Sequence, residues 1–128
     1  MDKEAQEWME NVLAWKFPTG HAYEDVLKDG IVLCRVLNKL KPGAVAKINE
    51  SGGQFKMMEN INNFQHALKE YGVPDIDVFQ TVDLWEKKDI GGVTNTVFAL
   101  GRAVIYQNIK ILSILHFYVV VYFYIYNC

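Results

Sequence analysis

The sequence predicts an all-α fold, and three observations lead to this prediction. Apolar residues recur at spacings of three and four in four separate segments, which is the period of one buried helix face. All three prolines stand between these segments and none inside them. No strand-like alternation of any length precedes Ala103. We therefore expect four main helices plus short connecting helices, followed by an atypical apolar C-terminal tail.

The first helix is expected over about residues 3–16. Its apolar face contains Trp8, and neighbouring apolar residues follow at helical spacing. Pro18 and Gly20 end the pattern, because proline cannot continue a helix and glycine favours its end.

The second helix is expected over about residues 23–40, with Leu33 and Leu37 facing inward. Pro42 and the glycine after it stop this helix. Gly30 lies inside the expected helix, where it costs about 1 kcal/mol relative to alanine. Close approach of another backbone would explain why a glycine stands there.

A loop over 44–56 is expected to lead into a third helix over about residues 57–71, in which Phe64 faces inward. Gly72 is typical of a helix end, and Pro74 prevents the helix from continuing.

The fourth helix is expected over about residues 90–106, after a short helical turn near 76–80. Asp83 and Asp89 are placed to cap helix starts, because their carboxylates can accept hydrogen bonds from free backbone N–H groups. Trp85 lies between them and is expected to fill the core that the last helix closes. Five large residues are expected in the structural core: Trp8, Leu33, Leu37, Phe64 and Trp85.

Length and charge indicate one domain without affinity for nucleic acid. The chain has 128 residues, of which 51% are hydrophobic, and its net charge is −2. No bulk positive charge is available to attract nucleic acid. Four lysines and one glutamate between residues 39 and 56 give a local excess of +3. We interpret this excess as a solvated connecting loop in preference to a patch for an acidic surface.

The chain carries no pattern typical of catalysis, a cofactor or a metal. Its three histidines are far apart, and none has metal-ligand spacing relative to a cysteine. Phosphate-binding and nucleophile-elbow motifs are also missing. We therefore expect no enzyme, no catalytic residue, no cofactor and no metal. Cys34 and Cys128 are too few for a disulfide framework, which favours a reducing, cytoplasmic setting.

The C-terminal segment differs in character from the rest. We expect residues 1–106 to form the domain and 107–128 to form an apolar tail, within which 111–126 carries no formal charge. Three interpretations are open: a short membrane anchor, a strand-prone segment that favours aggregation, or a terminus without evolved function. Membrane attachment is not favoured, because sixteen residues are fewer than the about 20 needed to span a bilayer.

Taken together, the residues resemble the calponin homology domain, a compact all-α module. The resemblance extends in order and spacing over residues 4–103 and ends there. The matching parts are Trp8, LKDG at 27–30, LC at 33–34, LN at 37–38, FK at 55–56, MENI at 58–61, Phe64, YGV at 71–73 and DLWE at 83–86. Two further segments, FQTVDL at 79–84 and FALGRA at 98–103, resemble the calponin and transgelin type, especially small invertebrate muscle proteins.

The resemblance implies a cytoplasmic, cytoskeletal protein of muscle that binds F-actin weakly through a single domain. The alternative is a scaffold whose partner is a signalling kinase or another cytoskeletal protein. The first and last long helices are implied as the contact regions, over 7–16 and 87–102. Candidate contact residues there are Glu7, Glu10, Trp15, Lys16, Lys87, Lys88 and Arg102.

Overall fold

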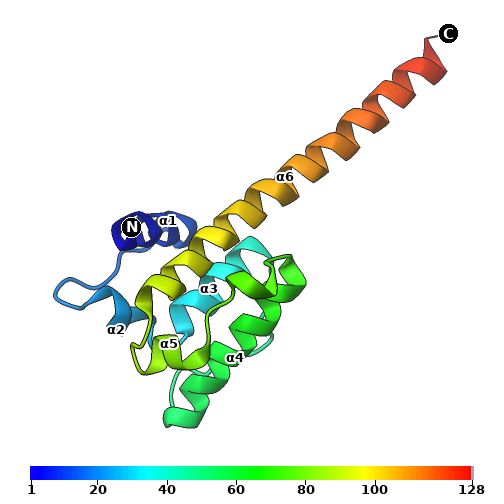
Figure 1. The fold of residues 1–128 in the computed structure, drawn as a ribbon. Helices are drawn as coiled ribbons and strands as arrows, with labels where there is room; N and C mark the ends of the chain where they lie inside the picture. Colours follow the sequence, from blue (N-terminus) through cyan, green and yellow to red (C-terminus); the bar gives the residue numbers. More distant parts are fainter. Residues whose placement is uncertain (128) are drawn as a thin grey trace.

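The computed structural model describes residues 1–127, and the elements it contains there are all helical (Figure 1). The elements in chain order are α1 (Asp2–Leu13), α2 (Tyr23–Leu27), α3 (Ile31–Leu40), α4 (Gln54–Tyr71), η1 (Asp75–Asp77), α5 (Thr81–Trp85) and α6 (Ile90–Tyr126). Residues 1–127 contain no strand. The predicted all-α fold, with four main helices and short connecting ones, is therefore confirmed.

Helix α3 lies at the centre of the domain. It packs against α1 on one side and against α4 on the other, while α6 packs against α1, η1 and α5. Leu33, Leu37 and Phe64 are almost fully buried between these helices. They are joined by apolar residues of α6 at the predicted spacing, Val93, Val97 and Leu100. The apolar stripes read from the sequence thus meet in one core.

Trp8 and Trp85 do not lie in that core, although the sequence predicted it. Both are only partly buried and pack against its edge. The Lys28 ammonium lies 4.7 Å from the centre of the Trp85 ring, so one ring face meets a cation instead of apolar side chains. A tryptophan is large and is rarely covered on all sides, even where its helical position faces inward.

The expected second helix is in fact two helices, because the chain turns at Gly30. This residue has φ +74°, a left-handed conformation that cannot continue a helix. A Cβ built on Gly30 would lie 2.9 Å from Cβ of Asn60 and 3.0 Å from the backbone nitrogen of Ile61. The predicted close approach of another backbone is therefore confirmed, whereas the predicted continuous helix over 23–40 is wrong.

The side-chain amide of Asn60 joins three segments at this point. Its Nδ2 donates to the backbone carbonyls of Asp29, at 3.0 Å, and Asn49, at 2.8 Å. Its Oδ1 accepts from the backbone N–H of Asn49 at 2.8 Å. Asn60 is completely buried, so these bonds satisfy both backbone groups of Asn49 and the amide itself in a place without water.

Other helix ends differ from the predicted ones by a few residues. Helix α1 ends at Leu13, because Ala14 adopts a left-handed conformation with φ 52°. Helix α4 begins at Gln54 instead of residue 57. The single turn expected near 76–80 is replaced by η1 and α5, one on each side of an extended link. Helix ends depend on local backbone choices that apolar spacing does not record.

The two aspartates predicted at helix starts hold those positions. The Oδ1 atom of Asp89 accepts from the backbone N–H of Gly92 at 2.9 Å and caps α6. The Oδ2 atom of Asp83 accepts from the backbone N–H of Gln80 at 2.8 Å, at the start of α5. Each carboxylate therefore satisfies a backbone donor that the first turn of its helix leaves open.

Helix α6 continues to Tyr126, far beyond the end expected near 106. Figure 1 shows its second half projecting away from the other helices. The helix is long and apolar enough to cross a membrane, and its most apolar stretch is not buried. The strand-prone interpretation of the tail is therefore wrong for 107–126, while the division into 1–106 and 107–128 stays a prediction. The last residue of that expected tail, Cys128, lies outside the described residues.

Replacing Asn60 by alanine should destabilise the domain. Asn60→Ala leaves the backbone groups of Asn49 and the Asp29 carbonyl without partners in the interior, and we expect a loss of about 2–4 kcal/mol in the free energy of unfolding. Urea unfolding measures it. Asn63→Ala is the matched control on the same helix, because its side chain makes no hydrogen bond within residues 1–127. Equal losses in the two variants would contradict the role of Asn60.

A second pair of variants separates backbone strain from steric contact. Gly20 and Gly30 both have positive φ, but only Gly30 has atoms within 4 Å of an added Cβ. Gly20→Ala should cost about 1–2 kcal/mol from the left-handed conformation alone. Gly30→Ala should cost about 1–3 kcal/mol more, because the backbone of α4 must move. Thermal unfolding of both variants measures the difference in stability. Equal losses would show that α4 moves aside at no cost.

Candidate interaction surface

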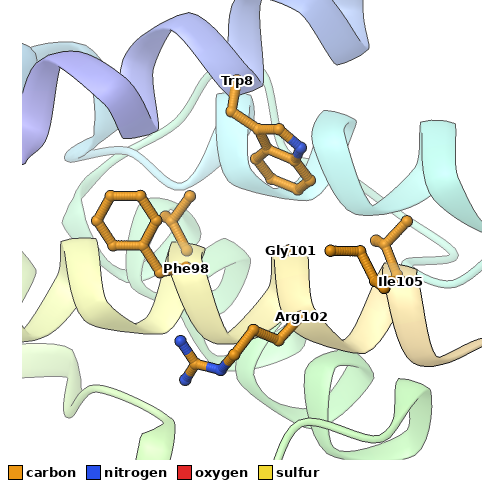
Figure 2. Close-up of a pocket in the computed structure, with 7 residues that line it drawn as sticks. Trp8, Phe98, Gly101, Arg102 and Ile105 are labelled. Atoms are coloured by element: carbon orange, nitrogen blue, oxygen red, sulfur yellow. The ribbon is translucent and has the colours of Figure 1, made fainter.

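An apolar groove runs between α1 and α6. It has a volume of about 400 Å³ and is lined by Trp8, Val97, Phe98, Gly101, Arg102, Val104 and Ile105. Figure 2 shows Trp8 reaching from α1 toward α6, between Phe98 and Ile105, while the Arg102 side chain extends away from it. Gly101 leaves the space open, since a Cβ placed there would meet no atom within 4 Å.

A chain of hydroxyl hydrogen bonds holds α1 and α2 against α6 beside this groove. The Thr94 hydroxyl donates to Oδ1 of Asp2 at 2.8 Å, and it lies 2.9 Å from the Tyr23 hydroxyl. Because the Thr94 hydroxyl proton is donated to Asp2, the Tyr23 hydroxyl is the donor in its hydrogen bond with the Thr94 oxygen. Burial raises the pKa of Tyr23 to about 12, so its proton stays in place at neutral pH.

A second surface lies where the chain leaves α1. The left-handed Ala14 turns Trp15 outward, and 41% of its side chain is exposed. Its ring lies 5.6 Å from the ring of Phe17, between centroids, so the inner side of Trp15 is supported by the core. Trp15 also borders a hollow of about 350 Å³, together with Asp25, Arg35 and Glu50. We call Trp15, Lys16 and the rim of this hollow the Trp15 surface.

Glu10 was expected as a contact residue, but the structure buries it. Only 7% of it is exposed, and Oε2 accepts from the backbone N–H of Phe17 at 2.7 Å. Oε1 lies 3.8 Å from the Lys16 ammonium. Glu10 therefore fixes the turn that carries Trp15 and is closed to a partner. Glu10 was predicted to be exposed because a glutamate near a helix end is usually solvated. The chain that folds back after α1, at Phe17, is what covers it.

Lys87 and Lys88 lie in the turn between α5 and α6. Lys87 forms an ion pair with Asp25, which also borders the hollow beside Trp15, so the structure brings Lys87 to the Trp15 surface. The hydrogen bond between them lowers the pKa of Asp25 and raises that of Lys87. Both groups are open to solvent, where such pairs contribute little stability. Lys88 is exposed and takes part in no ion pair within residues 1–127.

The remaining candidates lie elsewhere. Glu7 is exposed on α1, and Arg102 is exposed on α6, where it borders the apolar groove. The seven candidates thus do not form one patch. Trp15, Lys16 and Lys87 share one surface, Arg102 belongs to the groove, and the contact role of every exposed candidate stays a prediction.

Comparison with known proteins decides the family. The family model of the calponin homology (CH) domain matches residues 1–105, which is most of the chain. The chain belongs to the calponin homology family. The same fold is found in the solved structure of the calponin-homology domain of Rng2 from Schizosaccharomyces pombe, with a TM-score of 0.75 and 30% sequence identity. That match covers 84% of this chain and 68% of the other.

Two curated relatives are similar in sequence as well. Muscle-specific protein 20 of Drosophila melanogaster is 77% identical over 103 residues, which are 80% of this chain and 56% of that protein. Myophilin of Echinococcus granulosus is 56% identical over 102 residues, covering 79% and 54%. The chain therefore spans about half the length of these relatives.

Sequence reasoning missed two features of this calponin homology domain. It assigned Trp8 to the core and so missed the groove, whose lining brings Trp8 of α1 together with Gly101 and other residues of α6. It also missed the hollow beside Trp15, where Arg35 and Glu50 form an ion pair. Both features join residues far apart in the chain, and no local pattern marks them.

Two observations bear on metal binding and thiol chemistry in this calponin homology domain. Residues 1–127 contain no group of three side chains able to hold a metal ion. Cys34 is buried, and burial raises the pKa of its thiol to about 12, which keeps it protonated and unreactive at neutral pH.

Two glutamates on α1 should behave differently when truncated. Glu10→Ala removes the buried acceptor of the Phe17 N–H and should cost about 1–3 kcal/mol of unfolding free energy. Glu7→Ala, on the exposed side of the same helix, should change it by less than about 0.5 kcal/mol. Urea unfolding followed by tryptophan fluorescence measures both losses. Equal losses would show that Glu10 does not hold the turn.

Proposed function

We propose that this chain is a cytoplasmic, cytoskeletal protein of muscle or other contractile cells whose calponin homology domain binds actin filaments weakly. One observation carries the proposal: 77% identity over 103 residues to a protein named Muscle-specific protein 20. The relative supports the muscle setting, and the family resemblance supports actin as the partner. The relatives are about twice as long, so their activity as whole proteins is also only proposed for this chain.

The proposed mode of action is surface recognition without catalysis. A filament offers a wide surface, and a single domain meets it with a patch of mixed polar and apolar character. Affinity in such contacts concentrates in a few large anchors, among which tryptophan is enriched. Trp15 has this character, because it is half open to solvent while Phe17 holds its inner side.

Exposed lysines after the end of α1 and in the turn before α6 add to the proposed contact. Lys16 extends into solvent, with 83% of its side chain exposed, and only its distant contact with Glu10 restrains it. Lys88 is also exposed, while Lys87 is already engaged by Asp25. Lys16 and Lys88 are therefore the cations most available to a negatively charged partner. Binding through exposed charges weakens as salt rises.

The α1–α6 groove is a weaker candidate for filament contact. Its lining is apolar, and its one cation, Arg102, extends away from Trp8 (Figure 2). A filament surface in water is better matched by the mixed polar rim around Trp15. Arg102→Ala therefore serves to test the groove separately.

Cosedimentation with actin filaments tests the proposal. We expect the full chain to pellet with filaments at about 50 mM salt and less so at higher salt. Trp15→Ala should weaken the apparent affinity about tenfold or more, because it removes the supported aromatic anchor. Arg102→Ala should change it less than threefold.

Phe55→Ala is the matched control. Phe55 is an exposed aromatic residue, 86% open, in the first turn of α4, and α3 separates α4 from α1. Its loss should leave binding unchanged. A parallel spin without filaments corrects for self-pelleting through the apolar end of α6. Equal affinity of Trp15→Ala and wild type would exclude the Trp15 surface.

Failure of the wild-type chain to pellet at about 50 mM salt would overturn direct actin binding. Pull-down from muscle extract depleted of actin then examines the alternative, a scaffold for a signalling kinase or another cytoskeletal protein. Partners lost from Trp15→Ala but retained by Phe55→Ala would assign the same surface to that role.

A further inference from the structure

We propose that the distal part of α6, residues 109–126, spans a lipid bilayer and attaches the domain to a membrane. This stretch, the apolar segment, leaves its side chains in water in the isolated chain. Apart from Val121, which is partly buried, the large apolar residues of the segment are 48% or more exposed, from Ile114 at 48% to Tyr124 at 74%. A surface of this size and character needs a partner, because exposed apolar patches of such extent mark interaction sites.

The distribution of side chains around the helix favours lipid over a protein groove. Lys110, Ser113 and His116 are spaced by three and share one side of the first two turns. Beyond them, residues 117–126 are apolar or aromatic on every side. A helix lying on a surface or in a groove keeps one polar face, whereas an all-round apolar helix fits the inside of a bilayer.

The length of the helix matches a bilayer. From the sequence alone, the uncharged stretch after Lys110 has sixteen residues, which is too short to span a bilayer. The structure shows that the helix passes through Lys110 without a break, so Ile109 and Lys110 belong to the same rod. Eighteen residues rise about 27 Å, which equals the hydrocarbon thickness of thinner cellular membranes, about 27 Å.

Charged and aromatic residues lie where membrane boundaries would place them. Lys110, one residue inside the segment, can extend its ammonium back to the headgroups along its apolar stem. Tyr106 precedes the segment, and Tyr122, Tyr124 and Tyr126 occupy its far end, all exposed. Basic residues flank the domain side, with Arg102 and Lys110, and residues 111–128 contain none. This asymmetry places the domain on the cytoplasmic side.

Insertion would leave the domain intact. The Gln107 side chain still touches the body of the domain, with Nε2 donating to the carbonyl of Tyr71 at 3.0 Å. Residues 108–120 are all exposed. Figure 1 shows this part of α6 pointing away from every other helix, so a bilayer could surround it without touching the core.

Flotation tests the proposal with the full chain. The protein is synthesised in the presence of vesicles of phosphatidylcholine and phosphatidylserine, and the vesicles are then washed with carbonate at high pH and floated on a density gradient. We expect most wild-type protein to float after the wash. Tyr118→Lys combined with Val119→Lys places two charges near the middle of the apolar segment and should lower the floated fraction at least tenfold.

The matched control adds the same two charges to the domain. Phe55→Lys combined with Ile76→Lys replaces apolar residues that are 86% and 92% exposed on the domain surface. This variant should float like wild type. Equal flotation of the two double variants, or release of wild type by carbonate, would overturn insertion. Wild type that sediments alike with and without vesicles would show instead that the segments associate with one another.

Labelling distinguishes a spanning helix from one held at the surface. Cys128 follows the apolar segment in sequence, and a membrane-impermeant maleimide should label it only after detergent opens the vesicles. Cys34 gives little background because it is buried, and Cys128→Ser measures that background. Labelling of Cys128 in intact vesicles would overturn the spanning arrangement. None of these outcomes bears on actin binding, which the Trp15 variants test separately.

Discussion

The buried amide of Asn60 and the bare backbone of Gly30 form the contact on which the domain depends. Helix α4 approaches the turn before α3 so closely that a Cβ at Gly30 would lie 2.9 Å from Asn60. At that distance the Asn60 amide reaches the carbonyls of Asp29 and Asn49 and the N–H of Asn49. Three segments that share no regular pairing are thereby fixed together, and each polar group taken from water finds a partner.

With α3 and α4 fixed, the outer helices have a firm base. Helix α1 packs on α3 and α6, and the hydroxyl chain from Tyr23 through Thr94 to Asp2 anchors its start. Buried Glu10 anchors its end by binding the N–H of Phe17. The partly exposed ring of Trp15 lies on the turn that Glu10 fixes. A partner then loses little entropy in ordering this contact.

Helix α6 joins two environments in one continuous rod. Its first half presents one apolar stripe, including Val93 and Leu100, and buries it in the domain. Its second half is apolar on nearly every side and meets no other helix. A continuous helix of this kind holds the domain at a fixed distance and orientation relative to whatever surrounds its far end. The two proposed partners, a filament and a bilayer, would then be held at a fixed geometry.

The sequence by itself determined the helices, the core side chains Leu33, Leu37 and Phe64, and the absence of any familiar catalytic pattern, because apolar spacing and capping residues are local signals. Only the tertiary structure decided the break at Gly30, the burial of Glu10 and the partial exposure of Trp8. Each of these depends on a contact that apolar spacing does not record: the backbone of α4 against Gly30, the Phe17 N–H on Glu10, and the α6 residues that line the groove beside Trp8. The spacing of apolar residues predicts which face of a helix turns inward, but only tertiary packing determines which residues that face contacts.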